Sequence, residues 1–227
     1  MLEIKRLKKS FGKKHVLKEV NFTVKPGEIT CLVGVNGTGK TTVMNAIMQL
    51  FPIDEGELLI DGEPITVDNF SRISYIPDQI IVLKDWTIHE ALTFMRTFYP
   101  NFNEKKALEV LDFFKLHVTD RIADLSKGTV AKVNLVMGLA LDSDYLIMDE
   151  PFTGIDILSR EQIAQVFTTK LVEGKGVLLS THEINEIEHL IDRVVLLHEG
   201  RVAQDFYLEE LREEEGKSVI DVLREVD

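Results

Sequence analysis

The sequence contains a single cysteine, Cys31, so no disulfide bond can form within the chain. No apolar run approaches the roughly 18 residues that span a membrane, and the N-terminus carries charge where a signal peptide is apolar. Acidic residues outnumber basic ones, and the net charge of −12 argues against general nucleic-acid binding. These absences predict a soluble, cytosolic protein with no nucleic-acid partner, for which any role at a membrane requires another chain.

What the chain does contain is enough apolar material for a sizeable core, since 44 % of its 227 residues are hydrophobic. Residues 34–42, with the sequence GVNGTGKTT, are the most informative stretch. The apolar residues 29–33 before them indicate a buried strand, and residues 43–48 indicate the start of a helix. Strand, glycine-rich loop and helix in that order are typical of a phosphate-binding P-loop.

The residue types of this loop suit a nucleotide phosphate chain. Its glycines let successive N–H groups curl around an anion, and the following helix N-terminus adds partial positive charge. We expect Lys40 to reach the β- and γ-phosphates and the Thr41 hydroxyl to ligate Mg²⁺. The other loop residues expected to contact the nucleotide are Asn36, Gly37, Thr38, Gly39 and Thr42.

The rest of the chain alternates between strand and helix patterns. Residues 2–25 indicate two or three antiparallel strands, residues 57–62 a strand and tight turn, and residues 193–202 a closing hairpin. From residue 87 to about residue 141 the apolar spacing is helical, and Thr87 with Glu90 forms a capping box. The P-loop helix is expected to end near residues 50–52, and the acidic residues 209–227 are expected to be helical.

Two predicted buried strands end on side chains that suit ATP chemistry. Residues 145–148 lead into Asp149 and Glu150, and residues 177–181 lead into His182. Asp149 suits the second Mg²⁺ ligand, and Glu150, free of the metal, suits a general base. An isolated histidine is usually structural. Beside a P-loop and paired acids, however, His182 is better interpreted as a γ-phosphate sensor, since ligands bind beyond the carboxyl ends of parallel strands.

Two assignments stay open on residue type alone. Phe11 lies between Ser10 and Gly12. Its side chain could equally fill a space in the hydrophobic core or stack on a purine base. Pro77 ends the strand of residues 73–76, so that either Asp78 or Gln79 begins the next loop and is available to Mg²⁺ and the attacking water.

Over essentially its whole length the chain resembles the nucleotide-binding subunit of an ATP-binding cassette (ABC) transporter. Residues 34–41 match the Walker A motif, residues 146–150 match Walker B with its catalytic acid, residues 154–156 match the D-loop, and His182 matches the switch histidine. Residues 125–129 match the Leu-Ser-Gly-Gly-Gln signature imperfectly, because Lys127 and Thr129 replace Gly and Gln. The helix that follows the signature is expected to start near Thr129. The Q-loop also departs from the family, which usually has Gln at position 78.

The resemblance implies an α/β fold, namely a P-loop NTPase with a RecA-like core, an antiparallel β lobe and an inserted α-helical subdomain. Residues 1–227 would form a single ABC-type ATP-binding domain. Residues 1–79 and 142–208 would make the core with its β lobe, residues 80–141 the helical subdomain, and residues 209–227 an acidic helical tail. The family pattern assigns nucleotide contacts to Phe11, Val16, Asp78, Gln79, Ser126 and Gly128, and Mg²⁺ contacts to Thr41, Asp149 and Gln79.

The function implied is ATP binding and hydrolysis by two such subunits, identical or different, that sandwich two ATP molecules. Their closure would drive transport through a membrane-spanning permease docked on the helical subdomain near the Q-loop, on the inner face of the cell membrane. The signature and residues 99–102 are similar to bacitracin-resistance exporters. One alternative is a soluble ABC ATPase, which usually has two cassettes or a long coiled coil. Another is a small-molecule kinase, which would not explain Ser126 and Gly128.

Overall fold

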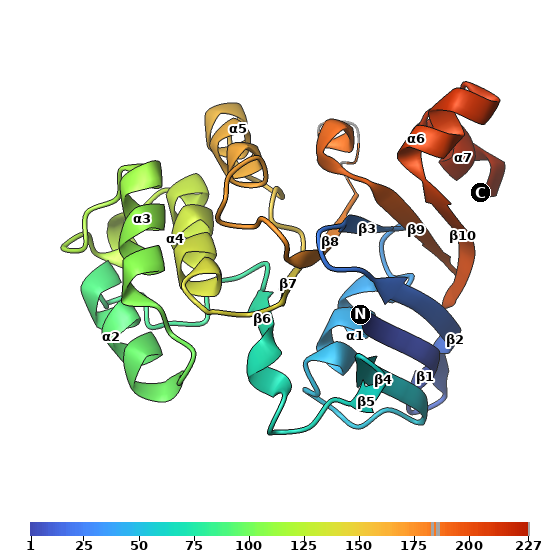
Figure 1. Cartoon of the computed structure of the whole chain (residues 1–227), viewed down its shortest axis with the longest axis horizontal. Helices are drawn as coiled ribbons and strands as arrows, with labels where there is room; N and C mark the ends of the chain where they lie inside the picture. The colour runs from blue at the N-terminus through green and yellow to red at the C-terminus, as the bar shows by residue number, and fades with distance from the viewer. Residues whose placement is uncertain (183, 185–186, 227) are drawn as a thin grey trace.

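The computed structural model describes residues 1–182, 184 and 187–226, and within them ten strands form one twisted mixed sheet (Figure 1). The strand order across the sheet is β5-β4-β1-β2-β10-β9-β3-β8-β7-β6. The strands are β1 (Leu2–Phe11), β2 (Lys14–Val24), β3 (Ile29–Val33), β4 (Glu55–Ile60), β5 (Glu63–Pro64), β6 (Ile73–Ile76), β7 (Tyr145–Met148), β8 (Gly176–Thr181), β9 (Arg193–His198) and β10 (Arg201–Tyr207).

Five of these strands, β6, β7, β8, β3 and β9, run parallel to one another and form the core of the sheet. Their side chains alternate between two apolar clusters on opposite faces: in β7, Leu146 and Met148 join one cluster while Tyr145 and Ile147 join the other. A parallel strand covered on both faces is apolar throughout, which explains why these segments carry almost uninterrupted hydrophobic runs.

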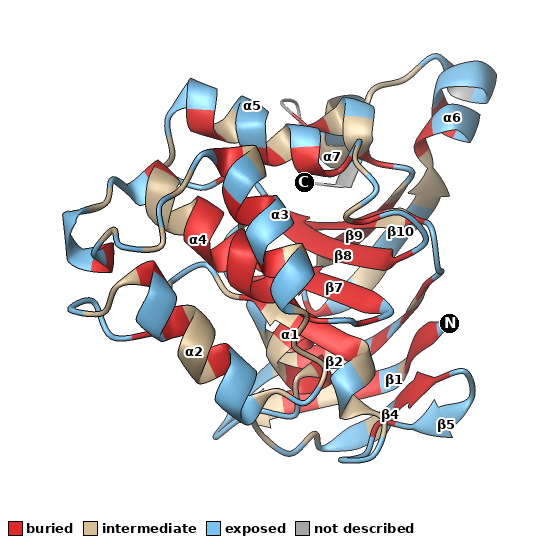
Figure 2. Ribbon diagram, turned by 60° about the vertical axis from the view of Figure 1, so that its left-hand side comes forward, coloured by how far each residue is buried: buried red, intermediate tan, exposed pale blue. Residues whose placement is uncertain are grey.

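Helices cover both faces of the sheet. In Figure 1, α2, α3 and α4 pack together at one end of the molecule, beyond β6. Figure 2 shows that most of α4 is buried. The helices are α1 (Lys40–Ile47), α2 (Ile88–Phe98), α3 (Glu104–Phe114), α4 (Lys127–Leu139), α5 (Ile157–Val166), α6 (Leu208–Glu210) and α7 (Val219–Val226), with short 3₁₀ turns at Phe70–Arg72, Ile122–Asp124 and Glu188–Leu190 and a π turn at Leu211–Glu215.

Helix α1 differs from its prediction at both ends, beginning at Lys40 and ending at Ile47. It begins early because the last loop glycine, Gly39, is itself the N-cap residue. It ends early because Gln49 has a φ of 53°, a left-handed conformation that an α-helix cannot contain. Helix α2, by contrast, has the predicted capping box, in which Thr87 and Glu90 exchange hydrogen bonds.

The N-terminal part of the sheet is antiparallel: β1 pairs with β2 on one side and with β4 on the other. Residues 2–25 were predicted to form two or three strands, and they form two, β1 and β2. This lobe joins the parallel core where β2 lies beside β10, with Arg201 opposite Glu19 in the ladder.

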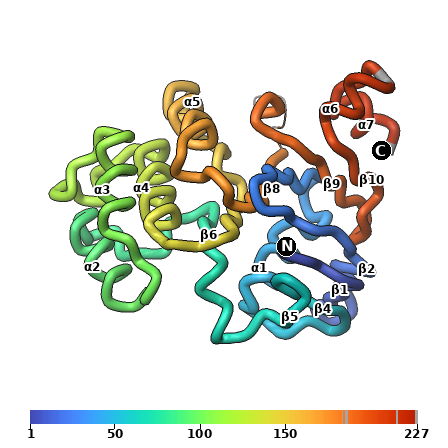
Figure 3. The backbone as a smooth tube through the Cα atoms, viewed as in Figure 1, coloured from blue at the N-terminus to red at the C-terminus, as the bar shows by residue number. Residues whose placement is uncertain are grey.

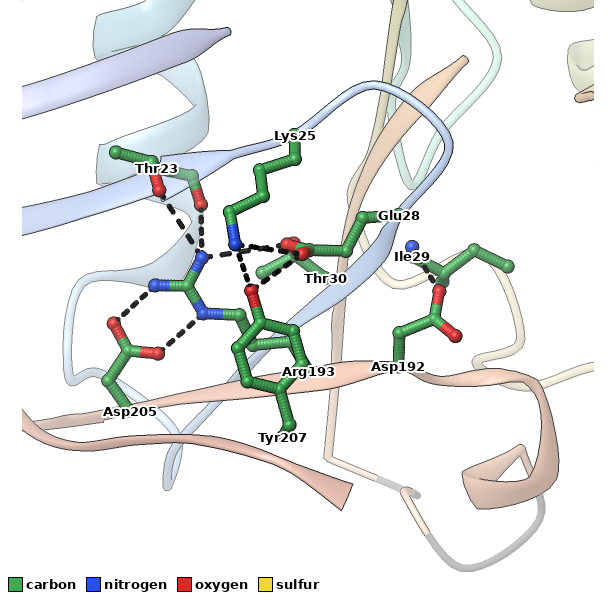
Figure 4. A network of polar contacts seen from close by, with 9 residues as sticks. All are labelled: Thr23, Lys25, Glu28, Ile29, Thr30, Asp192, Arg193, Asp205 and Tyr207. Atoms are coloured by element: carbon green, nitrogen blue, oxygen red, sulfur yellow. Dashed lines mark hydrogen bonds and ion pairs between the residues drawn. The ribbon is translucent and has the colours of Figure 1, made fainter. Parts of the chain in front are cut away.

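A partly buried ionic network reinforces that joint (Figure 4). The Arg193 guanidinium at the start of β9 makes a bidentate pair with Asp205 of β10, at 2.6 and 2.7 Å, and donates to the Thr23 carbonyl of β2 at 3.1 Å. The Glu28 carboxylate lies 3.5 Å from Arg193 and accepts a 2.9 Å hydrogen bond from the Tyr207 hydroxyl. The Arg193 guanidinium thus connects β2, β9 and β10 with Glu28, the residue before β3.

The C-terminal residues fold back onto the core after β10, as the backbone trace shows (Figure 3). Leu208, Val219 and Val222 are buried in the same apolar cluster as the inner strands. Among the described residues no helix is long and apolar enough to cross a membrane.

Candidate active site

The loop between β3 and α1 wraps around the side chain of Lys40. The buried ammonium donates to the Gly34 carbonyl at 2.7 Å and to the Val35 carbonyl at 3.4 Å, while the Thr38 hydroxyl donates to the same Val35 carbonyl at 2.9 Å. These bonds hold the Lys40 cation within the loop, so that an anion bound there would meet its positive charge.

Gly39 is required at the point where this loop becomes α1. Its φ of 110° lies outside the range that L-residues favour, and a Cβ atom there would lie 2.7 Å from Cδ2 of Leu17 and 3.3 Å from Cγ1 of Val16. The same distances place Val16, in β2, directly against the loop. At the tip, Asn36 and Gly37 are exposed to solvent.

Two acidic residues follow the end of β7 and differ in their surroundings. Asp149 is buried and accepts a 2.6 Å hydrogen bond from the Ser180 hydroxyl of β8, and the Thr41 side chain of α1 is close enough to lower its pKa. Burial raises the pKa of Asp149, and the negative charges of Asp78 and Glu150 act in the same direction. Burial and these two charges thus disfavour the ionised form of Asp149.

Glu150 is the meeting point of three segments that are distant in sequence. Its carboxylate lies 3.9 Å from the Lys40 ammonium and 2.8 Å from Nδ1 of His182, and it accepts a 3.0 Å hydrogen bond from the Thr153 hydroxyl. Its backbone has a φ of 49°, in the left-handed region that residues with a Cβ atom rarely adopt. The predicted meeting of Lys40, the paired acids and His182 is thus present in the structure.

The signature residues stand at the N-terminus of α4. The helix begins at Lys127 and not near Thr129 as expected, because Ser126 is the N-cap residue and its hydroxyl accepts the Thr129 N–H at 3.2 Å. Lys127 is exposed, whereas Gly128 is buried against α5: a Cβ atom at Gly128 would lie 2.3 Å from the Ser159 hydroxyl oxygen and 2.8 Å from Oδ2 of Asp156.

A groove of about 560 Å³ runs between the loop after β6 and the helical end of the molecule. Asp78 and Gln79 line it together with Lys127 and Glu150, so both Q-loop candidates lie near the acids. Asp78 is the one whose charge raises the pKa values of Asp149 and Tyr75.

Phe11, the last residue of β1, is half exposed and is not a core plug. Its ring packs edge-on against Phe51 at a centroid distance of 5.4 Å, and the Lys9 ammonium lies 5.2 Å from its centre. These contacts leave part of the ring open to solvent and fix its orientation.

Sequence reasoning missed two residues that contact the paired acids, Ser180 and Thr153. A signal for Ser180 was available, because it is a polar residue within an apolar strand and lies two positions before His182, on the same side of β8. Thr153 gave no comparable signal, because its contact with Glu150 depends on the turn that follows β7.

Comparison with known proteins agrees with this arrangement. The model of the ABC transporter family matches residues 17–153. The SkfA peptide export ATP-binding protein SkfE of Bacillus subtilis is 29 % identical over 99 % of this chain and 98 % of its own length. A solved ATP-binding subunit of an ABC transporter is 30 % identical, with a TM-score of 0.85 over 99 % of this chain and 98 % of its own.

A second solved structure is a dimer of the ATP-binding cassette MJ0796 in a post-hydrolysis state with ADP and phosphate. It is 27 % identical, with a TM-score of 0.79 over 92 % of this chain and 99 % of its own. These likenesses confirm the predicted α/β P-loop fold. Since the family model matches more than half of the residues, the chain belongs to the ABC transporter family, as a subunit that binds and hydrolyses ATP.

Proposed function

We propose that Lys40, Thr41, Asp149, Glu150 and His182 form the hydrolysis centre for MgATP in this subunit. The observation that carries the proposal is the convergence on Glu150: the P-loop lysine and the histidine after β8 both reach its carboxylate. Lys40 would exchange its bonds to the Gly34 and Val35 carbonyls for phosphate oxygens. Glu150 would then be free to accept a proton from the attacking water.

The oxygen donors next to the P-loop fit Mg²⁺. The Thr41 side chain is close enough to the Asp149 carboxylate to lower its pKa. Burial nevertheless raises that pKa overall, so a cation bound there would stabilise the charged form. Within the part of the chain that the structure describes, no group of three or more His, Cys, Asp or Glu side chains could hold a metal. That agrees with Mg²⁺, which usually takes one or two carboxylates and completes its shell with substrate phosphates and water. When bound, Mg²⁺ would neutralise part of the negative charge of the phosphates.

At the other end of the nucleotide, Phe11 and Val16 would contact the base and ribose. The half-exposed Phe11 ring supports this role, since stacking requires a free aromatic face. For the Q-loop, Asp78 and Gln79 both line the groove that reaches Glu150, so each is available to the metal and the water.

A second subunit, identical or related, would complete the site. Ser126 is exposed at the start of α4, and the α4 N-terminus is a favourable place for phosphate oxygens of the ATP bound to that subunit. Two large apolar side chains at the start of α5, Ile157 and Leu158, are more than 70 % exposed and suit burial in such a dimer. Closure of the dimer would bring the exposed signature residues to the partner's nucleotide.

The groove beside the Q-loop is the best candidate for the permease contact. Apolar side chains line much of it, among them Ile76, Ile80, Ile122 and Leu125, and it extends to Glu150. A short amphipathic segment of a membrane-spanning subunit would fit there and would hold this chain on the inner face of the cell membrane. Likeness to a peptide export ATP-binding protein supports export as the direction. The narrower resemblance to bacitracin-resistance exporters stays a prediction.

The test is Glu150→Gln, with Glu109→Gln on the exposed face of α3 as the matched control. The active-site variant should bind MgATP normally, turn over about 10²–10⁴-fold more slowly and elute as an ATP-bound dimer in gel filtration. The control should behave as the parent does. Normal turnover by Glu150→Gln would refute the proposed role of Glu150, and a purely monomeric elution would refute the ATP-sandwich dimer.

A further inference from the structure

Ser180 of β8 makes polar contacts with both of the acids that follow β7. Its side chain is completely buried, with 0 % of the residue exposed. Its hydroxyl donates to Oδ1 of Asp149 at 2.6 Å and accepts the backbone N–H of Glu150 at 3.0 Å. One hydroxyl therefore acts as a donor to Asp149 and as an acceptor for Glu150, two adjacent residues of the site.

The strand register explains this placement. Strands β7 and β8 are parallel, with Met148 opposite Leu179, so the next residues along the two chains are Asp149 and Ser180. His182 lies two positions beyond Ser180 and contacts the Glu150 carboxylate. Asp149 is thus contacted from β8 through Ser180, and Glu150 is contacted from the segment just after β8 through His182.

The hydrogen bond to the Glu150 N–H coincides with an unfavourable backbone conformation. Glu150 has a φ of 49°, and such conformations in residues with a Cβ atom persist only where the surroundings enforce them. In this conformation the Glu150 carboxylate reaches Lys40 and His182. Loss of the Ser180 hydroxyl would leave a buried N–H without its acceptor and would leave Asp149 without its 2.6 Å donor.

We propose that Ser180 is a positioning residue for ATP hydrolysis, which sets the metal-side carboxylate of Asp149 and the backbone of Glu150 in a fixed relation to each other. The proposal rests on the functions proposed above for these two acids. Ser180 itself touches neither nucleotide nor water in this scheme, and it acts through the geometry of the acids. Partners of this kind typically alter metal affinity or activity by about 10- to 100-fold when they are removed.

The experiment compares Ser180→Ala, Ser180→Thr and Ser180→Val. Threonine and valine have nearly the same shape, so both add the same methyl group to a buried position and differ only in the hydroxyl. The matched control is Ser74→Ala, which removes another fully buried serine hydroxyl, on β6, whose partner is the Gly138 carbonyl at 2.7 Å. Two quantities are measured. The first is the Mg²⁺ concentration at which a non-hydrolysable ATP analogue produces half of its maximal rise in Tm. The second is kcat for ATP hydrolysis.

Ser180→Ala and Ser180→Val should raise the half-saturating Mg²⁺ concentration and lower kcat, each by about ten-fold or more, with analogue binding in EDTA unchanged. Ser180→Thr should restore both quantities to near the parent's values, and Ser74→Ala should lower Tm without changing either. Equal Mg²⁺ dependence and equal kcat in the threonine and valine variants would overturn the proposal. Failure of Glu150→Gln to slow turnover would instead refute the assignment of the acids.

Discussion

Nδ1 of His182 lies 2.8 Å from Oε2 of Glu150, so the segments that follow two neighbouring strands meet at a single carboxylate. The same carboxylate accepts the Thr153 hydroxyl at 3.0 Å and lies 3.9 Å from the Lys40 ammonium. A group held from three sides has little rotational freedom. Geometry of this kind stabilises a transition state at no cost in reorganisation, because the partners are already in place.

Replacement of His182 by alanine should therefore slow turnover without weakening nucleotide binding. The imidazole contacts the proposed base, and we expect kcat to fall about 100-fold while the affinity for a non-hydrolysable ATP analogue changes little. His117→Ala, an exposed histidine at the end of the turn after α3, is the control. Normal turnover of His182→Ala would show that the contact with Glu150 has no part in hydrolysis.

At the start of α4, adjacent residues should respond very differently to substitution. Gly128→Ala would place a Cβ atom 2.3 Å from the Ser159 hydroxyl oxygen, so that α4 and α5 must separate. We expect a loss of about 1–3 kcal/mol in the free energy of unfolding and about 100-fold slower turnover, through displacement of the signature. Lys127→Gly alters an exposed side chain and should change turnover by no more than about three-fold. Urea denaturation and steady-state ATPase assays on both variants test this contrast.

How far the sequence predicts this structure depends on how local each feature is. The P-loop lies within one strand, one loop and one helix, so its residues identify it without knowledge of the fold. The meeting of the acids with His182 was also predictable, because carboxyl ends of parallel strands share one edge of a sheet. The hydrogen bonds of Ser180 could not be assigned, since they depend on which residues of β7 and β8 stand side by side.

Gly128 illustrates the same limit in packing. The resemblance to the family assigned it to the nucleotide of a second subunit, and its neighbours within this chain, Asp156 and Ser159, are about thirty positions away. Nothing in the spacing of α4 and α5 indicates that the two helix N-termini touch. The start of α4 was misplaced for a simpler reason: the serine that caps it is also the signature serine, and its second role was overlooked.

The Arg193 network should contribute more to stability than any exposed ion pair of the chain. The Arg193 side chain is 11 % exposed, and Arg193→Met would leave the buried carboxylate of Glu28, which is 9 % exposed, without its guanidinium and would also break the bidentate pair with the partly exposed Asp205. We expect a loss of about 3–5 kcal/mol in the free energy of unfolding. Arg201→Met removes an exposed guanidinium, 3.8 Å from Glu19, and should cost less than about 1 kcal/mol. Similar midpoints in urea for the two variants would contradict a structural role for the network.

Because of Lys175, the free energy of unfolding should increase with pH in the alkaline range. Its amine precedes β8 in a buried position and is hydrogen-bonded to the Ser143 carbonyl and hydroxyl. Burial, together with the nearby positive charge of Lys106, lowers the pKa of Lys175 from its ordinary 10.5 to about 8. In the pH range between these two values the unfolded chain binds the proton that the folded chain has lost. The free energy of unfolding should therefore rise with pH through this range.

The variant Lys175→Met isolates this effect, because the other titrating groups are common to both proteins. Below pH 8 the lysine is protonated in the folded and the unfolded chain, so the stability difference between parent and variant should be constant there. From pH 8 to 10 the parent should gain stability relative to the variant. Urea denaturation at pH 7, 8, 9 and 10 measures the difference, and the exposed Lys170→Met is the control for loss of one charge. If the difference for Lys175→Met varies with pH no more than that for Lys170→Met, the buried amine does not lose its proton near pH 8.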